Sequence, residues 1–186
     1  MKSKIILITG PKHSGKTLCA TALGKIMGVE AVDLDDLVEK QTGKSPREIF
    51  LQGPEIFRRA EEQTLSSVIR QAKPGRVYDG NQNIRIIAAG GGLVDNNEAM
   101  ALLHGYSEII FVFLDVSAET AWQRIQCTAA DGELPPFLNT ENPKETHLAL
   151  HERRSGAYKE RAHLIIAAEN KSPEDIASEI AERLRL

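Results

Sequence analysis

The stretch Gly10-Pro11-Lys12-His13-Ser14-Gly15-Lys16-Thr17 decides how this chain is organised. It follows an apolar run at residues 5–8 and precedes a segment of helical character that begins at Leu18. This is the P-loop pattern G-x-x-x-x-G-K-[ST] in the strand, loop and helix setting that the motif requires. Glycines let backbone amides approach a polyphosphate, and the helix N-terminus adds a positive field for anions. We therefore predict that these eight residues and Leu18 bind a nucleotide polyphosphate, and the alternative is an ordinary glycine-rich turn.

Two side chains of this loop can interact directly with the phosphates or with a bound metal ion. Lys16 is placed to reach the outer phosphates, which makes it a candidate catalytic residue. Thr17 offers a hydroxyl oxygen, the usual protein ligand of Mg²⁺ in such loops. The loop thus predicts ATP and Mg²⁺ as cofactors.

Size and composition narrow the class of protein. The chain has 186 residues, which favours one domain over residues 1–186. Its net charge of −3 gives no basic surface for nucleic acid, and no stretch approaches the roughly 18 apolar residues that span a bilayer. Two cysteines without metal or redox spacing suit a reducing cytoplasm, and the N-terminus shows no signal sequence. We expect a cytoplasmic monomer whose partner is a small molecule, not nucleic acid or a membrane.

Apolar runs alternate with helical periodicity along the chain, which predicts an α/β fold with three αβα layers and a parallel sheet. The expected strands are residues 4–9, 30–34, 85–89, 108–114 and 163–167, and the expected helices are residues 16–27, 36–42, 46–51, 54–71, 97–104, 118–129, 144–159 and 173–184. Ligands of such folds gather at the carboxyl ends of the strands.

Two segments interrupt this alternation. Residues 73–83 are rich in turn formers and predict a surface excursion. Residues 128–143 contain several prolines and predict a lid, for which a passive connection is the alternative.

Carboxylates cluster where the second strand is expected to end. Asp33 and Asp35 are two residues apart, and side chains at that spacing share one face of a strand. One of them can help to hold Mg²⁺, and the other can accept a proton from an alcohol. Asp36 competes for these roles, and a solvated helix start is the alternative for all three.

Arginines and glycines supply a second group of candidates. Arg58 lies in a long amphipathic segment and can grip an anionic substrate with its planar fork. Gly90, Gly91 and Gly92 end a strand and permit close approach of another molecule. Arg154 follows the expected lid, and for both arginines the alternative is a solvated charged face.

Taken in order, these residues make the chain resemble the shikimate kinases over nearly its whole length. The resemblance rests on the P-loop, Asp33-Leu34-Asp35 followed by Gly43, Glu48-Ile49-Phe50, Phe57-Arg58 with Glu61, the three glycines, and Arg154 four residues before Tyr158. It implies a five-stranded parallel sheet with flanking helices and a mobile lid, as in nucleoside monophosphate kinases. It also implies transfer of the γ-phosphoryl group of ATP to the 3-hydroxyl of shikimate.

The resemblance also implies roles for single residues. Asp35 matches the aspartate that binds the reacting hydroxyl, and Asp33 matches the aspartate on the magnesium side. Arg58 and Arg154 match the arginines that clamp the substrate carboxylate. The glycines at 90–92 match those lining the shikimate pocket, and Arg124 matches an arginine near adenine.

The expected lid departs from the family pattern. Its members carry Arg-Pro-Leu-Leu there, whereas this chain has Pro135-Pro136-Phe137-Leu138 and no Lys or Arg in residues 128–143. His13 also stands where the family usually has a glycine. Withholding an arginine finger costs about 10³–10⁵ in rate in the enzymes that use one. We therefore expect another cation to substitute for the lid arginine, and Lys12 is the first candidate. The alternatives are a slow enzyme, an enzyme that phosphorylates a different small hydroxy acid such as gluconate, or a nucleotide-binding regulatory domain without catalysis.

Overall fold

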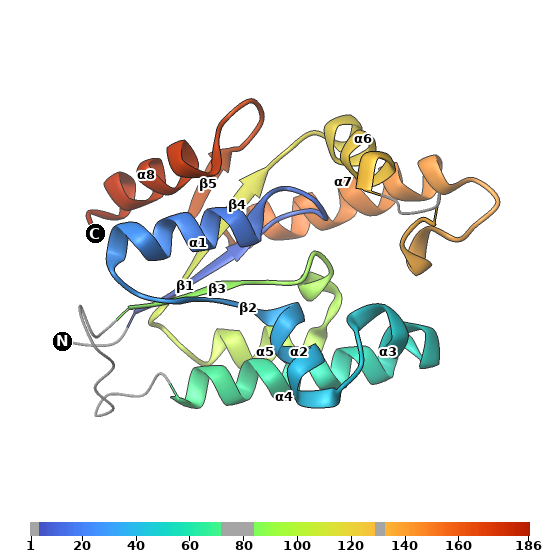
Figure 1. Ribbon diagram of the computed structural model, residues 1–186, viewed down its shortest axis with the longest axis horizontal. Helices are drawn as coiled ribbons and strands as arrows, with labels where there is room; N and C mark the ends of the chain where they lie inside the picture. Colours follow the sequence, from blue (N-terminus) through green and yellow to red (C-terminus); the bar gives the residue numbers. More distant parts are fainter. Residues whose placement is uncertain (1–3, 72–83, 129–132) are drawn as a thin grey trace.

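The computed structural model describes residues 4–71, 84–128 and 133–186, and its centre is a five-stranded parallel sheet (Figure 1). The strand order is β2-β3-β1-β4-β5. The strands are β1 (Lys4–Thr9), β2 (Ala31–Asp33), β3 (Ile84–Ala88), β4 (Ile109–Asp115) and β5 (Leu164–Ala167). The predicted α/β class and five-stranded parallel sheet are confirmed.

Helices cover both faces of the sheet. Helices α1 (Lys16–Met27) and α8 (Pro173–Leu184) pack on one face, and α4 (Pro54–Gln71) and α5 (Asn97–His104) pack on the other (Figure 1). Successive residues of β1 therefore point into different layers of the core, and Ile6 and Ile8 face α1 and α8 while Ile5 and Leu7 face α4 and α5. This explains why the strand is apolar at every position.

The remaining helices lie toward the carboxyl ends of the strands (Figure 1). They are α2 (Leu34–Thr42), α3 (Pro46–Gln52), α6 (Ala118–Thr128) and α7 (Pro143–Arg161), with short 3-10 turns η1 (Leu93–Asp95) and η3 (Pro136–Leu138). Helix α3 begins with a capping box between Ser45 and Glu48 and has Pro46 in its first turn. Both features satisfy or remove N–H groups that the helix leaves unpaired.

The prediction that Asp33 and Asp35 share one face of a strand is wrong. Strand β2 ends at Asp33, and α2 begins at Leu34, two residues before the expected start. Asp33 is the N-cap of α2, because its Oδ1 accepts a hydrogen bond from the backbone N–H of Asp35 at 2.9 Å. A capping carboxylate satisfies an unpaired N–H and so favours the helix over a longer strand.

One interrupting segment and part of the other lie outside the described residues. These are residues 73–83, the whole expected excursion, and residues 129–132, near the start of the expected lid. Among the helices that the structure does describe, none combines the length and apolar character needed to cross a membrane.

Candidate active site

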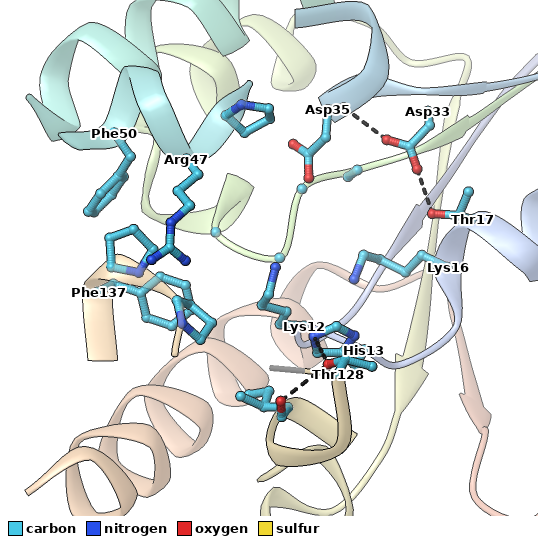
Figure 2. Close-up of a pocket in the computed structure, with 18 of the residues that line it drawn as sticks. Lys12, His13, Lys16, Thr17, Asp33, Asp35, Arg47, Phe50, Thr128 and Phe137 are labelled. Carbon is cyan, nitrogen blue, oxygen red and sulfur yellow. Dashed lines mark hydrogen bonds between the residues drawn. The ribbon is translucent and has the colours of Figure 1, made fainter. Parts of the chain in front are cut away.

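A cavity of about 710 Å³ opens at the carboxyl ends of the strands (Figure 2). Of the site residues predicted from sequence, twelve line it: Lys12, His13, Gly15, Lys16, Thr17, Leu18, Asp33, Asp35, Gly90, Gly91, Gly92 and Arg154. Five do not: Gly10, Pro11, Ser14, Arg58 and Arg124. The fold thus brings the phosphate motif, both carboxylates and the glycine turn to one space.

The P-loop is held closely against the sheet. A Cβ on Gly10 would lie 2.7 Å from Oγ of Ser14 and 2.9 Å from the carbonyl oxygen of Leu114, so only glycine fits there. The Nζ of Lys16 donates to the carbonyl oxygen of Pro11 at 2.8 Å. Burial lowers the pKa of Lys16 to about 8, although Asp35 raises it, so the charge of this lysine depends on anions in the cavity. Gly10, Pro11 and Ser14 therefore shape the loop, whereas Lys16 faces the cavity.

His13 takes an unusual conformation for a residue with a side chain, with φ of 60°. Its Nε2 lies 3.0 Å from Oγ1 of Thr128, and its carbonyl oxygen accepts from Nη1 of Arg124 at 3.0 Å. Burial, together with the charges of Lys12 and Lys16, lowers the pKa of His13 to about 4. The imidazole is therefore neutral near pH 7, and Arg124 supports the P-loop backbone from α6.

Thr17 and Asp33 form a pair of hard oxygen ligands at the edge of the P-loop. Oγ1 of Thr17 donates to Oδ2 of Asp33 at 2.5 Å, which Figure 2 marks with a dashed line. Mg²⁺ prefers such oxygens and usually takes only one or two from protein, with the rest from water and phosphates. Within the described residues no group of three or more His, Cys, Asp or Glu could hold a metal. The pair fits Mg²⁺ carried with a nucleotide better than a separate protein metal site.

Two carboxyl groups, each with one buried oxygen, lie beside Gly90. A Cβ on Gly90 would lie 3.0 Å from Oδ1 of Asp35 and 2.9 Å from Oε1 of Glu61, so the missing side chain makes room for both. Neither oxygen has a hydrogen-bond partner within the described part of the chain. Burial raises the pKa of Asp35, as does Asp33 nearby. Oδ1 of Asp35 is buried at Gly90, but the residue also lines the cavity, so its carboxylate can meet a ligand hydroxyl, whereas Asp36 is exposed and does not line the cavity.

Glu61 and Asn96 tie the helix α4 to the turn that follows the glycines. Burial raises the pKa of Glu61 to about 7, although a bond of 2.9 Å from Nδ2 of Asn96 lowers it. The same amide donates to the backbone carbonyl of Arg58 at 2.8 Å. The side chain of Arg58 itself is exposed and lies outside the lining, and its neighbour Phe57 lines the cavity instead. The clamping role of Arg58 stays a prediction.

Sequence reasoning missed the part of the site contributed by α3. Arg47 lines the cavity, and its Nη2 lies 2.8 Å from Oε2 of Glu133 while its Nη1 donates to the carbonyl of Leu134 at 3.1 Å. Phe50, one turn later on α3, contacts the ring of Phe137 edge-on at 6.5 Å between centroids (Figure 2). One signal was present, because an arginine in the first turn of a helix opposes the helix dipole and needs another reason to be there.

The described part of the expected lid brings no cation to the cavity. Pro135, at the position of the family's lid arginine, is buried and lines it. The described cations of the lining are Lys12, Lys16, Arg47 and Arg154. Figure 2 shows Lys12 extending from the P-loop into the cavity.

The fold and the site together define a P-loop kinase. The parallel sheet has a P-loop after its central strand, and a carboxylate and a basic side chain lie across the same cavity. A family model described as shikimate kinase matches residues 12–185. The chain therefore belongs to the shikimate kinase family and is a phosphotransferase.

Individual relatives agree with this assignment. The chain is 32% identical over 180 residues to a shikimate kinase of Parasynechococcus marenigrum (strain WH8102), covering 96% of this chain and 85% of that protein. It is 26% identical over 186 residues to a shikimate kinase of Marinomonas sp. (strain MWYL1), covering 100% and 94%. The solved shikimate kinase of Acinetobacter baumannii in complex with shikimate has the same fold, with a TM-score of 0.80 at 24% identity over 98% of this chain and 93% of that one.

Proposed function

We propose that this protein transfers the γ-phosphoryl group of ATP to the 3-hydroxyl of shikimate. The observation that carries the proposal is the cavity itself, which joins the P-loop lysine Lys16 to Asp35, the glycine turn and Arg154 in one space. Phosphoryl transfer depends mainly on positioning and charge stabilisation, and these residue types supply both. Family membership and the shikimate bound to the Acinetobacter baumannii relative support the choice of acceptor.

The P-loop side binds the nucleotide. Backbone amides of the loop and the N-terminus of α1 face the phosphates, and Lys16 offsets their charge. Thr17 and Asp33 would hold Mg²⁺, since their oxygens already lie together at this edge of the cavity. Bound Mg²⁺ supplies positive charge to the phosphate oxygens during transfer.

The opposite side holds and activates the acceptor. The carboxylate of Asp35, which lines the cavity, accepts the hydrogen bond, and then the proton, of the reacting hydroxyl. The hydroxyl oxygen forms a bond to the γ-phosphorus as the bond to the β–γ bridging oxygen breaks, and ADP leaves. Arg154 binds the substrate carboxylate, and Arg58 joins it as a second clamp.

Lys12 supplies the charge that the lid lacks. It lines the cavity from the P-loop, and its charge acts on Lys16, His13 and Asp35. Arg47, in contrast, is held by Glu133 and Leu134. We further propose that residues 1–186 act as one domain, as a cytoplasmic monomer without nucleic-acid or membrane partners.

A coupled assay of ADP release with and without shikimate tests the function. We expect ATP turnover to depend on shikimate, and no turnover with gluconate or related hydroxy acids. Turnover that millimolar shikimate leaves unchanged would overturn the acceptor assignment. Turnover with gluconate instead would keep the kinase and replace its substrate, and inertness with every acceptor would leave a nucleotide-binding domain without catalysis.

A further inference from the structure

Arg154 is already engaged by a carboxylate of the chain itself. Its Nε donates to Oδ2 of Asp95 at 2.8 Å, and its Nη2 lies 2.7 Å from the same oxygen. Both side chains are largely buried, with 13% of Asp95 and 17% of Arg154 exposed. A charge pair of this burial is bound more firmly than an ordinary surface ion pair.

The contacts of Asp95 leave a defined part of the guanidinium free. A guanidinium has five N–H donors, and Asp95 takes the one on Nε and one on Nη2. The edge formed by Nη1 and the second N–H of Nη2 remains, and that edge matches a carboxylate in the bidentate manner. Arg154 lines the cavity, so this edge is the part of it that remains for an acceptor carboxylate.

Phe137 and Gly92 also border the guanidinium. Its Cζ lies 5.5 Å from the centroid of the Phe137 ring. A Cβ on Gly92 would lie 3.1 Å from Nη2, so a larger residue there would press on the guanidinium. The turn that carries Asp95 is itself tied to α7, because the backbone N–H of Val94 donates to the hydroxyl of Tyr158 at 3.1 Å. Asp95 therefore holds Arg154 at a set position relative to the glycine turn.

Asp95 keeps its charge under ordinary conditions. Burial raises its pKa, but the bonds from Arg153 and Arg154 outweigh burial and bring the pKa below its ordinary value. Arg153 takes the outer side of the carboxylate, with its Nη1 2.8 Å from Oδ1, and is 60% exposed. Arg153 therefore pairs with Asp95 from the solvent side, and Arg154 pairs with it from the side of the cavity.

We propose that Asp95 is a positioning residue for the acceptor site, which orients Arg154 so that its free edge binds the substrate carboxylate. The proposal rests on the proposed function, since it takes the acceptor to be a carboxylic acid such as shikimate. It predicts that Asp95 governs acceptor affinity and leaves the nucleotide side unaffected.

The test compares Asp95→Ala and Asp95→Asn with Arg153→Ala, which removes the exposed partner of the same carboxylate. We expect Asp95→Ala to raise the KM for shikimate by about 10- to 100-fold, as misplacement of a positioning group does. We expect kcat and the KM for ATP to change less than about threefold in every variant, with Asp95→Asn intermediate and Arg153→Ala near wild type. An unchanged or lower shikimate KM in Asp95→Ala would overturn the proposal, as would an equal rise in the KM for ATP.

A measurement without turnover separates this proposal from the proposed function. The Nε–H resonance of Arg154, assigned by its loss in Arg154→Lys, reports the bond to Asp95 directly. We expect slow exchange with water in wild type and Arg153→Ala, and fast exchange in both Asp95 variants. Equal exchange in wild type and Asp95→Ala would overturn the positioning role, whatever the enzyme phosphorylates. Wild type without shikimate-dependent turnover, but with a protected resonance, would overturn the acceptor and keep the positioning role.

Discussion

The P-loop side of the cavity is built mainly from neighbouring residues, and the acceptor side is built from distant ones. Apart from Asp33 at the end of β2, the P-loop side comes from residues 10–18, which form the loop after β1 and the start of α1. The acceptor side combines Asp35 of α2, Glu61 of α4, Asp95 of η1 and Arg154 of α7 with the glycine turn. Chain connectivity positions the first side, whereas packing and buried hydrogen bonds position the second. The acceptor side should therefore be more sensitive to changes in residues that touch no ligand.

The two sides also differ in the state of their charged groups. The P-loop lysine Lys16 is half-buried, lines the cavity and has a lowered pKa. On the acceptor side, Asp35 and Glu61 have raised pKa values, and each has a buried oxygen without a partner in the described residues. The nucleotide side thus holds a cation of lowered pKa, and the acceptor side holds carboxyl groups of raised pKa.

The largest effect is expected for Asp35→Asn, which removes the proposed proton acceptor while preserving shape. We expect kcat to fall by about 10³-fold, within the range for loss of a general base, while the KM for ATP stays within a few-fold. Asp36→Asn is the matched control, because Asp36 is an exposed neighbour that does not line the cavity. Steady-state kinetics measures both, and equal kcat in Asp35→Asn and wild type would remove Asp35 from the mechanism.

A smaller effect is expected for Lys12→Met, which tests whether the P-loop supplies the charge that the lid lacks. Loss of one charge-stabilising group typically costs about 10²-fold in kcat. Lys12→Arg keeps the charge and should keep most of the activity. Lys44→Met, a control at an exposed lysine outside the lining, should behave like wild type. A kcat in Lys12→Met within twofold of wild type would show that the charge comes from elsewhere.

The smallest effect is on stability and concerns Glu61. Its folded pKa of about 7 lies above the ordinary value of 4.5, so the folded state favours the protonated form. Stability is therefore lost as pH rises from about 5 to 8, by about 2 kcal/mol from this group alone. We expect Glu61→Gln to make the free energy of unfolding depend less on pH, and to be more stable than wild type at pH 8.

Denaturant unfolding of wild type and Glu61→Gln at pH 5 and pH 8 measures this difference. Glu62→Gln, at the next residue of α4, is the control and should follow the wild-type dependence. A pH dependence in Glu61→Gln equal to that of wild type would show that Glu61 is not protonated in the folded protein.

Local patterns predicted the fold well. The bounds of β1, α1, α4, α5 and α8 agree with the expected ranges, since apolar periodicity and capping residues mark them directly. The start of α2 was misplaced, because the side chain of Asp33 decides between one more strand residue and a helix cap. That choice depends on a hydrogen bond that residue type alone does not reveal.

The site was predicted unevenly for the same reason. Lys12, His13, residues 15–18, Asp35 and Arg154 were predicted from spacing and resemblance, and the structure places them around one cavity. Arg47 and Asp95 were not, because each acts through a partner far along the chain, 86 residues away for Glu133 and 59 for Arg154. No local pattern reports such pairs.

The sequence by itself determined that this protein binds a nucleotide polyphosphate, because residues 10–17 carry the necessary backbone freedom, lysine and hydroxyl in one continuous segment. It also determined the order of strands and helices along the chain. Only the tertiary structure decided which cations face the cavity, which are held by other carboxylates, and which carboxylate oxygens are buried without a partner within the described residues. The physical reason is that charge, burial and hydrogen bonding at this site depend on groups brought together by packing.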